Sequence, residues 1–248
     1  MSKETEPASG RGFRHRALPI LTKALHGSAP FISTFLLIHL TAPMLANLGG
    51  SSLASSVLLL GREYYQTDFG EKYLLLGPLA VHSLSGIAKR LLSPPKVPPR
   101  PWTSLLSLTG YANMLFFLPI HFMTHRVHPK TPAPPILALG PSELDFEFVK
   151  YGLAKFPWRS WFLYGGLVVC AVLHFVDGDR LLFNTYFGES MGRIKAASRK
   201  RLLAIGTALV TLPVLAGTYV MSKEPLMILS TTAERIQACF SKSPIYKL

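Results

Sequence analysis

Four of the chain's eight histidines lie within apolar segments that carry no charged side chain. They form two matched pairs: His39 and His121 each follow a Phe-Leu-x-Ile sequence, and His82 and His174 are each followed four residues later by glycine. An ionisable group inside a membrane is costly, so it usually has a function or a partner. Haem iron accepts two imidazoles from facing helices. The pattern predicts two haem b groups, with interhelical hydrogen bonding as the alternative role for each histidine.

Glycines and arginines accompany the second pair of histidines. Gly86 and Gly178 lie one helical turn beyond His82 and His174, where a missing side chain lets a flat macrocycle or a neighbouring helix come close. Arg90 and Arg180 follow at the ends of the same apolar segments. Two roles are expected for these arginines, pairing with haem propionates or anchoring the helix ends among lipid headgroups.

The composition indicates a membrane protein. Of the 248 residues 49% are hydrophobic and 16% are charged, whereas about 25% of the residues of a soluble domain are charged. A membrane-spanning helix needs roughly 20 apolar residues. Five segments meet this requirement, at about residues 30–48, 72–90, 103–124, 159–177 and 202–221.

The expected fold is therefore all-α, a polytopic five-helix transmembrane bundle. The bundle is expected over residues 29–222, between a basic tail of residues 1–28 and a C-terminal tail of residues 223–248. Five apolar residues of the C-terminal tail are expected to lie along the membrane surface. They are Leu226, Ile228, Leu229, Ile236 and Phe240.

The first four spans form a tandem repeat of two helices each, and the second copy has a longer, proline-rich connection. Repeats in the same orientation predict a pseudo-two-fold axis along the membrane normal. This symmetry pairs His39 with His121 in one leaflet and His82 with His174 in the other. His125 and His128, at the edge of the third span, are expected at the membrane interface.

The net charge of +13 is assigned to loops that contact anionic headgroups rather than to nucleic acid. Residues 1–28, 89–101 and 177–201 hold 15 lysines and arginines against 5 acidic residues. The positive-inside rule therefore predicts a cytosolic N-terminus, with the C-terminus across the membrane. The basic tail also has the positive charge that is typical of a mitochondrial presequence. Glu4 and Glu6 interrupt that pattern, so a solvated tail is the favoured interpretation.

The remaining motifs argue against catalysis. The two cysteines, Cys170 and Cys239, have no metal-site spacing, and no nucleophile–base pair, phosphate loop or carboxylate dyad is present. The chain is therefore expected not to be an enzyme, unless its haems are redox-active. Its proline-rich segment 93–101 fits either a stiff turn or an extended element that a partner recognises.

One family resemblance follows from the histidines. Five spans with a histidine in each of the first four resemble the dihaem membrane anchors of succinate:quinone oxidoreductases, in which helices one and three hold one haem and helices two and four the other. The segment from His82 to Arg90 is similar to their His-x-x-x-Gly-x-Arg-His stretch, except that Ala88 and Lys89 replace its arginine and its second histidine. The resemblance implies a b-type dihaem cytochrome that carries electrons across a membrane.

The chain is also similar, over most of its length, to the fungal Mdm-ten-complementing protein family. That resemblance is carried by Pro43 and by residues 61–66, 80–86 and 173–178. It implies a multi-pass protein of the mitochondrial outer membrane that acts in lipid homeostasis at organelle contact sites. Its implied partners are membrane lipids and a bridge-like lipid-transfer protein of the VPS-thirteen type.

In that family a Pro-x-Pro element binds the transfer protein. Pro99 and Pro101 fit this short pattern on the predicted cytosolic side, and Pro132 and Pro134 fit it on the opposite side. The resemblance therefore implies Pro99 and Pro101 as the partner-binding residues.

Overall fold

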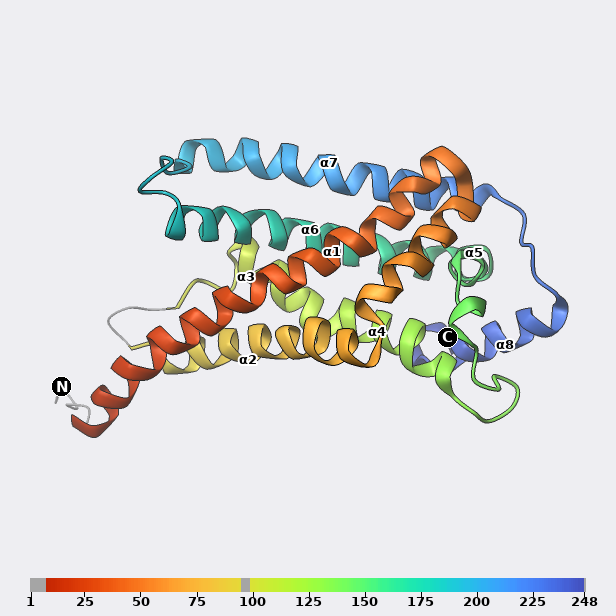
Figure 1. Cartoon of the computed structure of the whole chain (residues 1–248), viewed down its shortest axis with the longest axis horizontal. Helices are drawn as coiled ribbons and strands as arrows, with labels where there is room; N and C mark the ends of the chain where they lie inside the picture. The colour runs from red at the N-terminus through yellow and green to blue at the C-terminus, as the bar shows by residue number, and fades with distance from the viewer. Residues whose placement is uncertain (1–7, 95–98, 248) are drawn as a thin grey trace. The chain divides into compact units, whose positions relative to one another are not determined.

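The computed structural model describes residues 8–94 and 99–247, and every regular element within these ranges is a helix (Figure 1). The prediction of an all-α membrane protein is confirmed. The chain forms two compact units. The first unit contains the residues up to Leu37 together with Glu63–Trp102, and the second contains Ile38–Arg62 and Thr103–Leu248.

The first unit is built from the two ends of one long helix and from the helix that follows it. Helix α1 covers Ala8–Tyr65, and the π-helix η1 (Gly70–Leu76) leads directly into α2 (Gly77–Leu92). The ring of Phe35 packs edge-on against Tyr65, with 5.0 Å between the ring centroids. Helix α2 ends at Ser93, whose extended backbone stops the helix and whose hydroxyl donates to the Lys89 carbonyl at 2.8 Å.

Helix α1 is broken at Gly49 and Gly50, where Gly50 has a φ of 61°. An L-residue strongly disfavours this conformation, whereas glycine adopts it readily. The first helical segment therefore ends at this point, close to the predicted end of the first span. Residues 51–65 were expected to be loop, but they form a second helical segment, which turns back in Figure 1.

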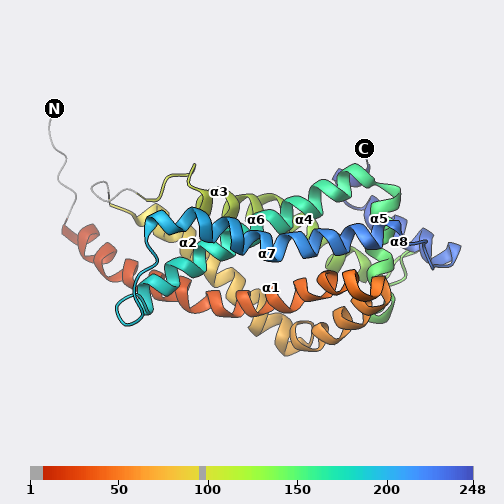
Figure 2. The ribbon, with the colours of Figure 1, turned by 90° about the horizontal axis from the view of Figure 1, so that it is seen from above.

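The second unit contains a continuous helical stretch and two long helices. The stretch changes between α and π turns around Pro119, since proline cannot donate the hydrogen bond of a regular α-turn. Its elements are α3 (Leu105–Ala112), η2 (Asn113–Phe117), α4 (Leu118–Phe122), η3 (Met123–Val127) and η4 (His128–Lys130). The long helices α6 (Pro157–Tyr186) and α7 (Ala196–Lys223) pack side by side, as Figure 2 also shows.

Four helices are long and apolar enough to cross a membrane: Gly12–Tyr65, Leu105–Lys130, Pro157–Tyr186 and Ala196–Lys223. The predicted count of five spans is not confirmed, because the helical region 70–92 is not among these four. His82, Ser83 and Ser85 interrupt its apolar residues. Four such helices make the chain a multi-pass membrane protein.

Short helices next to the long ones enclose an aromatic core. They are η5 (Pro141–Glu143), α5 (Phe146–Lys155), α8 (Ser230–Ser241) and α9 (Pro244–Lys247). Phe148 and Phe240 stack with 4.8 Å between ring centroids, and Tyr246 packs edge-on against Phe240. Phe240 and Ile236 are fully buried in this core. The expectation that these two residues lie along the membrane surface is therefore wrong, because the face of α8 that carries them packs against protein.

Candidate functional site: the membrane histidines

His39 and His121 face each other in the second unit. Their ring centroids are 6.0 Å apart and their planes are inclined by 78°. Iron–nitrogen bonds of about 2 Å on either side of a metal place two axial imidazoles with their centres about 6 Å apart. The Nδ1 atom of His121 is buried and has no hydrogen-bond partner among the described residues. The predicted pair is thus brought together, at a spacing that suits a bis-imidazole metal centre.

His125 extends this pair into a cluster. Its ring stacks on that of His121, with 4.6 Å between centroids and 30° between planes. Its Nε2 atom lies 3.2 Å from the hydroxyl of Tyr164 on α6. His125 was expected at the membrane interface, but its ring packs against His121, Phe148 and Tyr164 instead. Its position one helical turn after His121 is a signal in the sequence that the two residues share a helix face.

A small cavity lies beside this cluster. It is lined by Ile120, His121, Thr124, His125, Leu163, Tyr164 and Tyr246. The hydroxyl of Thr124 is buried and, like His121 Nδ1, has no hydrogen-bond partner within the described ranges. Buried polar atoms are normally satisfied, so the cavity suits a water molecule or another small hydrogen-bonding group.

His82, in the first unit, has its Nδ1 atom 3.1 Å from the carbonyl oxygen of Leu25 and 3.4 Å from the hydroxyl of Ser28. A carbonyl oxygen only accepts hydrogen bonds, so Nδ1 carries the proton in the bond with Leu25. The lone pair of the neutral imidazole then lies on Nε2. This is the tautomer of a histidine that binds a metal through Nε2 while a backbone carbonyl orients its ring.

His174, in the second unit, has the same arrangement on different helices. Its Nδ1 atom donates to the carbonyl of Leu106 on α3 at 3.0 Å. The ring lies so close to α3 that a Cβ atom added to Gly110 would come within 2.7 Å of His174 Cε1. His82 belongs to the first unit and His174 to the second.

The two glycines predicted to make room for a haem or a helix, Gly86 and Gly178, have more open surroundings than Gly110. A Cβ atom on Gly178 would meet nothing within 4 Å, and one on Gly86 would make an ordinary contact of 3.8 Å with Leu25. The glycine that makes room for a histidine ring is therefore Gly110. Gly110 could not be identified from the sequence, because it is distant from His174 in the chain.

The predicted accessory arginines bind protein groups. Arg90 donates to the Arg100 carbonyl at 2.6 Å, and its guanidinium lies 3.8 Å from the centre of the Trp102 ring. Arg180 donates from Nε to Asp177 at 3.2 Å. Asp177 is fully buried and also accepts two hydrogen bonds from Arg199, at 2.9 and 2.5 Å. These ion pairs of Asp177 with Arg180 and Arg199, which join α6 to α7, were not predicted from the sequence.

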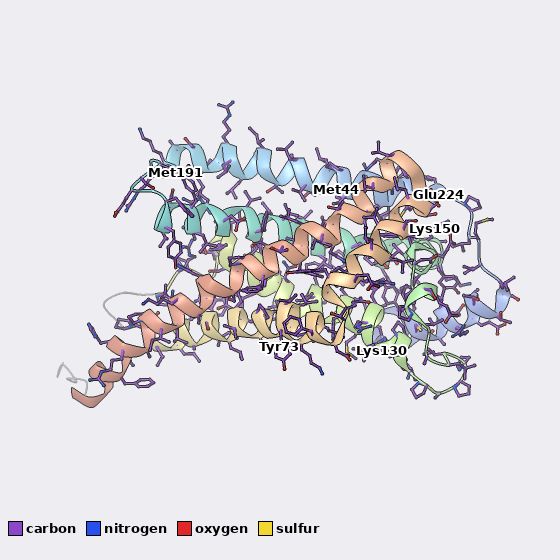
Figure 3. All side chains as sticks on the ribbon, viewed as in Figure 1. Met44, Tyr73, Lys130, Lys150, Met191 and Glu224 are labelled. Atoms are coloured by element: carbon purple, nitrogen blue, oxygen red, sulfur yellow. The ribbon has the colours of Figure 1, made fainter. Side chains whose placement is uncertain are left out.

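A second buried cluster surrounds the break in α1. Lys150 is 2% exposed and lies 2.5 Å from a carboxylate oxygen of Glu147 and 3.4 Å from one of Glu224. Figure 3 shows the labelled Lys150 and Glu224 close together. Lys150 thus offsets one of the two carboxylate charges and links α5 to the end of α7.

The predicted partner-binding prolines, Pro99 and Pro101, are exposed in the first unit. Residues 95–98 of the same proline-rich segment lie outside the described ranges. No group of three or more histidine, cysteine or acidic side chains suitable for a metal ion occurs in residues 8–94 and 99–247.

Part of the chain matches a known protein family. Residues 116–229, a little under half of the chain, match the family model described as MDM10-complementing protein 1, transmembrane domain. The match includes His121 and His174, whereas His39, His82 and Pro99 lie outside it. It confirms the predicted family over this part of the chain. No curated protein and no solved protein structure was found to match.

Proposed function

Because residues 116–229 carry the transmembrane domain of the MDM10-complementing protein 1 family, we propose that this chain supports lipid homeostasis at contact sites of the mitochondrial outer membrane. In this proposal it is a non-catalytic adaptor for a bridge-like lipid-transfer protein of the VPS-thirteen type. The family match carries the proposal, and the four candidate membrane spans agree with it. The N-terminus is proposed to face the cytosol, since a five-span topology places the basic connections 89–101 and 177–201 on its side.

The segment Pro99-Arg100-Pro101 is proposed to bind the transfer protein. Arg90 holds the carbonyl of Arg100 and lies against the ring of Trp102, so the backbone between the two prolines is fixed to the end of α2. Both prolines are exposed on either side of this fixed point. A backbone that is already ordered loses less entropy when a partner binds, which supports its role as a recognition element.

The test is recruitment of a fluorescently labelled lipid-transfer protein to mitochondria in cells that express only the variant chain. We expect the Pro99→Ala/Pro101→Ala variant to lose recruitment. The Pro132→Ala/Pro134→Ala variant is the matched control, because it alters an exposed Pro-x-Pro element in another connection. Recruitment that survives in the first variant, at equal expression, overturns the assignment of the binding element.

A second candidate function is haem binding, as in a b-type dihaem cytochrome. Two observations favour it: the 6.0 Å spacing of His39 and His121, and the Nδ1–carbonyl hydrogen bonds of His82 and His174. These four residues would hold haem b, which supplies one-electron redox chemistry when bound. The protein would orient the imidazoles and keep Nε2 of His82 and His174 unprotonated.

Spectroscopy of the purified chain distinguishes the two candidates. Two haems per chain in the pyridine haemochrome assay, one lost in His39→Ala and the other in His82→Ala, would support the cytochrome. His15→Ala is the control, since His15 lies in the basic tail outside both pairs. A colourless protein that still recruits the transfer protein would assign the four histidines to helix packing.

A further inference from the structure

Two arginines share one buried carboxylate between α6 and α7, which lie side by side (Figure 2). Asp177 is fully buried, and both of its carboxylate oxygens accept hydrogen bonds. Arg180 donates to one oxygen through Nε, and Arg199 donates to both oxygens through Nε and Nη2. Two positive charges thus meet one negative charge. These three residues, which we call the Asp177 cluster, keep a net charge of +1.

The arginines of the Asp177 cluster have donors left for a further anion. Within residues 8–94 and 99–247, neither Nη atom of Arg180 makes a hydrogen bond, and Nη1 of Arg199 makes none either. The side chain of Arg180 is 11% exposed and that of Arg199 is 32% exposed, so a group at the protein surface can reach them. A guanidinium presents parallel N–H donors that match two oxygens of one phosphate.

Neighbouring carboxylates do not supply the missing negative charge. Residues 177–201 contain six lysines and arginines, against three acidic residues, which are Asp177, Asp179 and Glu189. In the described part of the chain, neither Asp179 nor Glu189 forms an ion pair with the two arginines of the cluster. A partly buried charge is poorly screened by water, so it favours a nearby charge of opposite sign. The surroundings of the cluster therefore favour an external anion.

A membrane lipid is the source of phosphate that suits the place of the cluster in the fold. Both α6 and α7 are candidate membrane-spanning helices. The cluster lies at the shared end of their charge-free stretches, residues 160–176 and 202–222. Basic pockets between membrane helices bind anionic headgroups. Because phospholipid phosphates line both faces of a bilayer, this assignment requires neither a count of spans nor a choice of side.

We propose that the Asp177 cluster binds the phosphate of an anionic phospholipid. Arg180 and Arg199 donate to the phosphate oxygens through their Nη atoms, while Asp177 holds both side chains through Nε. One negative headgroup charge, as in phosphatidylglycerol, neutralises the cluster. The choline ammonium of phosphatidylcholine cancels the charge of its own phosphate, so this lipid binds more weakly.

The proposal requires that the chain lies in a membrane, but it does not require recruitment of the lipid-transfer protein. A chain that prefers phosphatidylglycerol and fails to recruit that protein would refute the adaptor function alone.

The test is native mass spectrometry of the full chain in a non-ionic detergent, titrated with phosphatidylglycerol or phosphatidylcholine. We expect phosphatidylglycerol to bind roughly fivefold more tightly or better. Arg180→Gln and Arg199→Gln are each expected to reduce this preference to less than about twofold. The matched control is Lys200→Gln, which removes one positive charge from an exposed side chain next to Arg199 and should keep the preference.

Asp177→Asn separates a lipid site from an ion cluster that only joins the helices. This change removes the competing carboxylate and leaves both arginines, so the folded variant should prefer phosphatidylglycerol at least as strongly as the wild type. Circular dichroism and the unfolding midpoint of each variant check that its helices form. The wild type and Arg199→Gln, whose altered side chain is the more exposed, test the proposal even where Asp177→Asn does not fold.

Four results overturn the proposal. The first is equal affinity of the wild type for the two lipids, and the second is loss of the preference in Lys200→Gln to the same extent as in Arg180→Gln. The third is tighter binding of inorganic phosphate than of phosphatidylglycerol, which would assign the cluster to a soluble ligand. The fourth is displacement of phosphatidylglycerol by a polyglutamate peptide, which would assign it to an acidic protein.

Discussion

The carboxylate of Glu224 accepts the backbone N–H of Ser51 at 2.9 Å, and thereby joins the end of α7 to the second helical segment of α1. Ser51 is the first residue after the break in α1, so Glu224 provides an anionic cap at the start of that helical segment. Burial raises the pKa of Glu224, but the hydrogen bonds from Ser51 and Lys150 outweigh this effect and hold the pKa below its usual value. The charged carboxylate is thus the form that the fold stabilises.

Gly50→Ala is predicted to destabilise this junction. The added Cβ atom would lie 2.3 Å from a carboxylate oxygen of Glu224, and residue 50 has a φ of 61°. Such backbone conformations cost about 1–3 kcal/mol for residues other than glycine. We expect a lower midpoint of thermal unfolding in detergent. Gly165→Ala is the control, because a Cβ atom there meets nothing within 4 Å, and an equal loss in both variants would contradict the explanation.

Gly110→Ala is predicted to displace the ring of His174 and break its hydrogen bond to Leu106. The new methyl group would approach His174 Nδ1 to 2.9 Å, and overpacking of this kind costs about 1–3 kcal/mol. We expect a lower unfolding midpoint and a shift in the His174 imidazole signals in nuclear magnetic resonance spectra. Gly178→Ala, in open space one turn after His174, should leave both unchanged. An unchanged Gly110→Ala variant would show that the helices do not approach this closely.

Acidification is predicted to remove the contribution of Glu143 to stability. Hydrogen bonds from the Gly140 N–H and from Arg235 hold the pKa of Glu143 below its usual value of 4.5. A carboxyl with a lowered pKa in the folded state stabilises the fold above its unfolded pKa and loses that effect as the pH falls through the folded pKa. The difference in unfolding midpoint between wild type and Glu143→Gln should be largest near pH 6 and should decrease as the pH falls below the usual carboxyl pKa of 4.5. A difference that does not depend on pH would contradict this role.

Cys239 is predicted to resist alkylation in the folded protein. Its side chain is fully buried, and burial raises the pKa of its thiol to about 12. The thiolate is the reactive form, so maleimide should label Cys239 far more slowly than free cysteine at pH 7.5. The measurement is mass spectrometry of a Cys170→Ser variant, with and without denaturant. Rapid labelling without denaturant would mean that the core around Phe240 opens readily.

Much of the fold could be predicted from the sequence because membrane helices depend on local properties. Helical hydrogen bonds close within a few residues, and hydropathy is a property of the segment itself. The spans in 105–130, 157–186 and 196–223 follow from their composition alone. The region 70–92 shows the limit of this reasoning: its charge-free part, residues 73–88, contains polar residues, and the region is not among the four helices that are long and apolar enough to cross a membrane.

Within the candidate site, the repeat in the sequence predicted the pairing of His39 with His121, which lie together in the second unit. The repeat could not reveal Gly110, because the ring that it accommodates belongs to a helix more than sixty residues away. It also could not reveal that Arg180 binds Asp177 together with Arg199, since that contact depends on the packing of α6 against α7.

The sequence by itself thus determined an all-helical membrane protein, its main spans and the residue types available for its chemistry. Only the tertiary structure decided that Ile236 and Phe240 are buried, that Glu224 caps the segment after Gly50, and that His125 joins the paired histidines. The physical reason is the same in each case. Local patterns specify which residues form a helix, whereas the partners of each helix face come from segments that are distant in the chain.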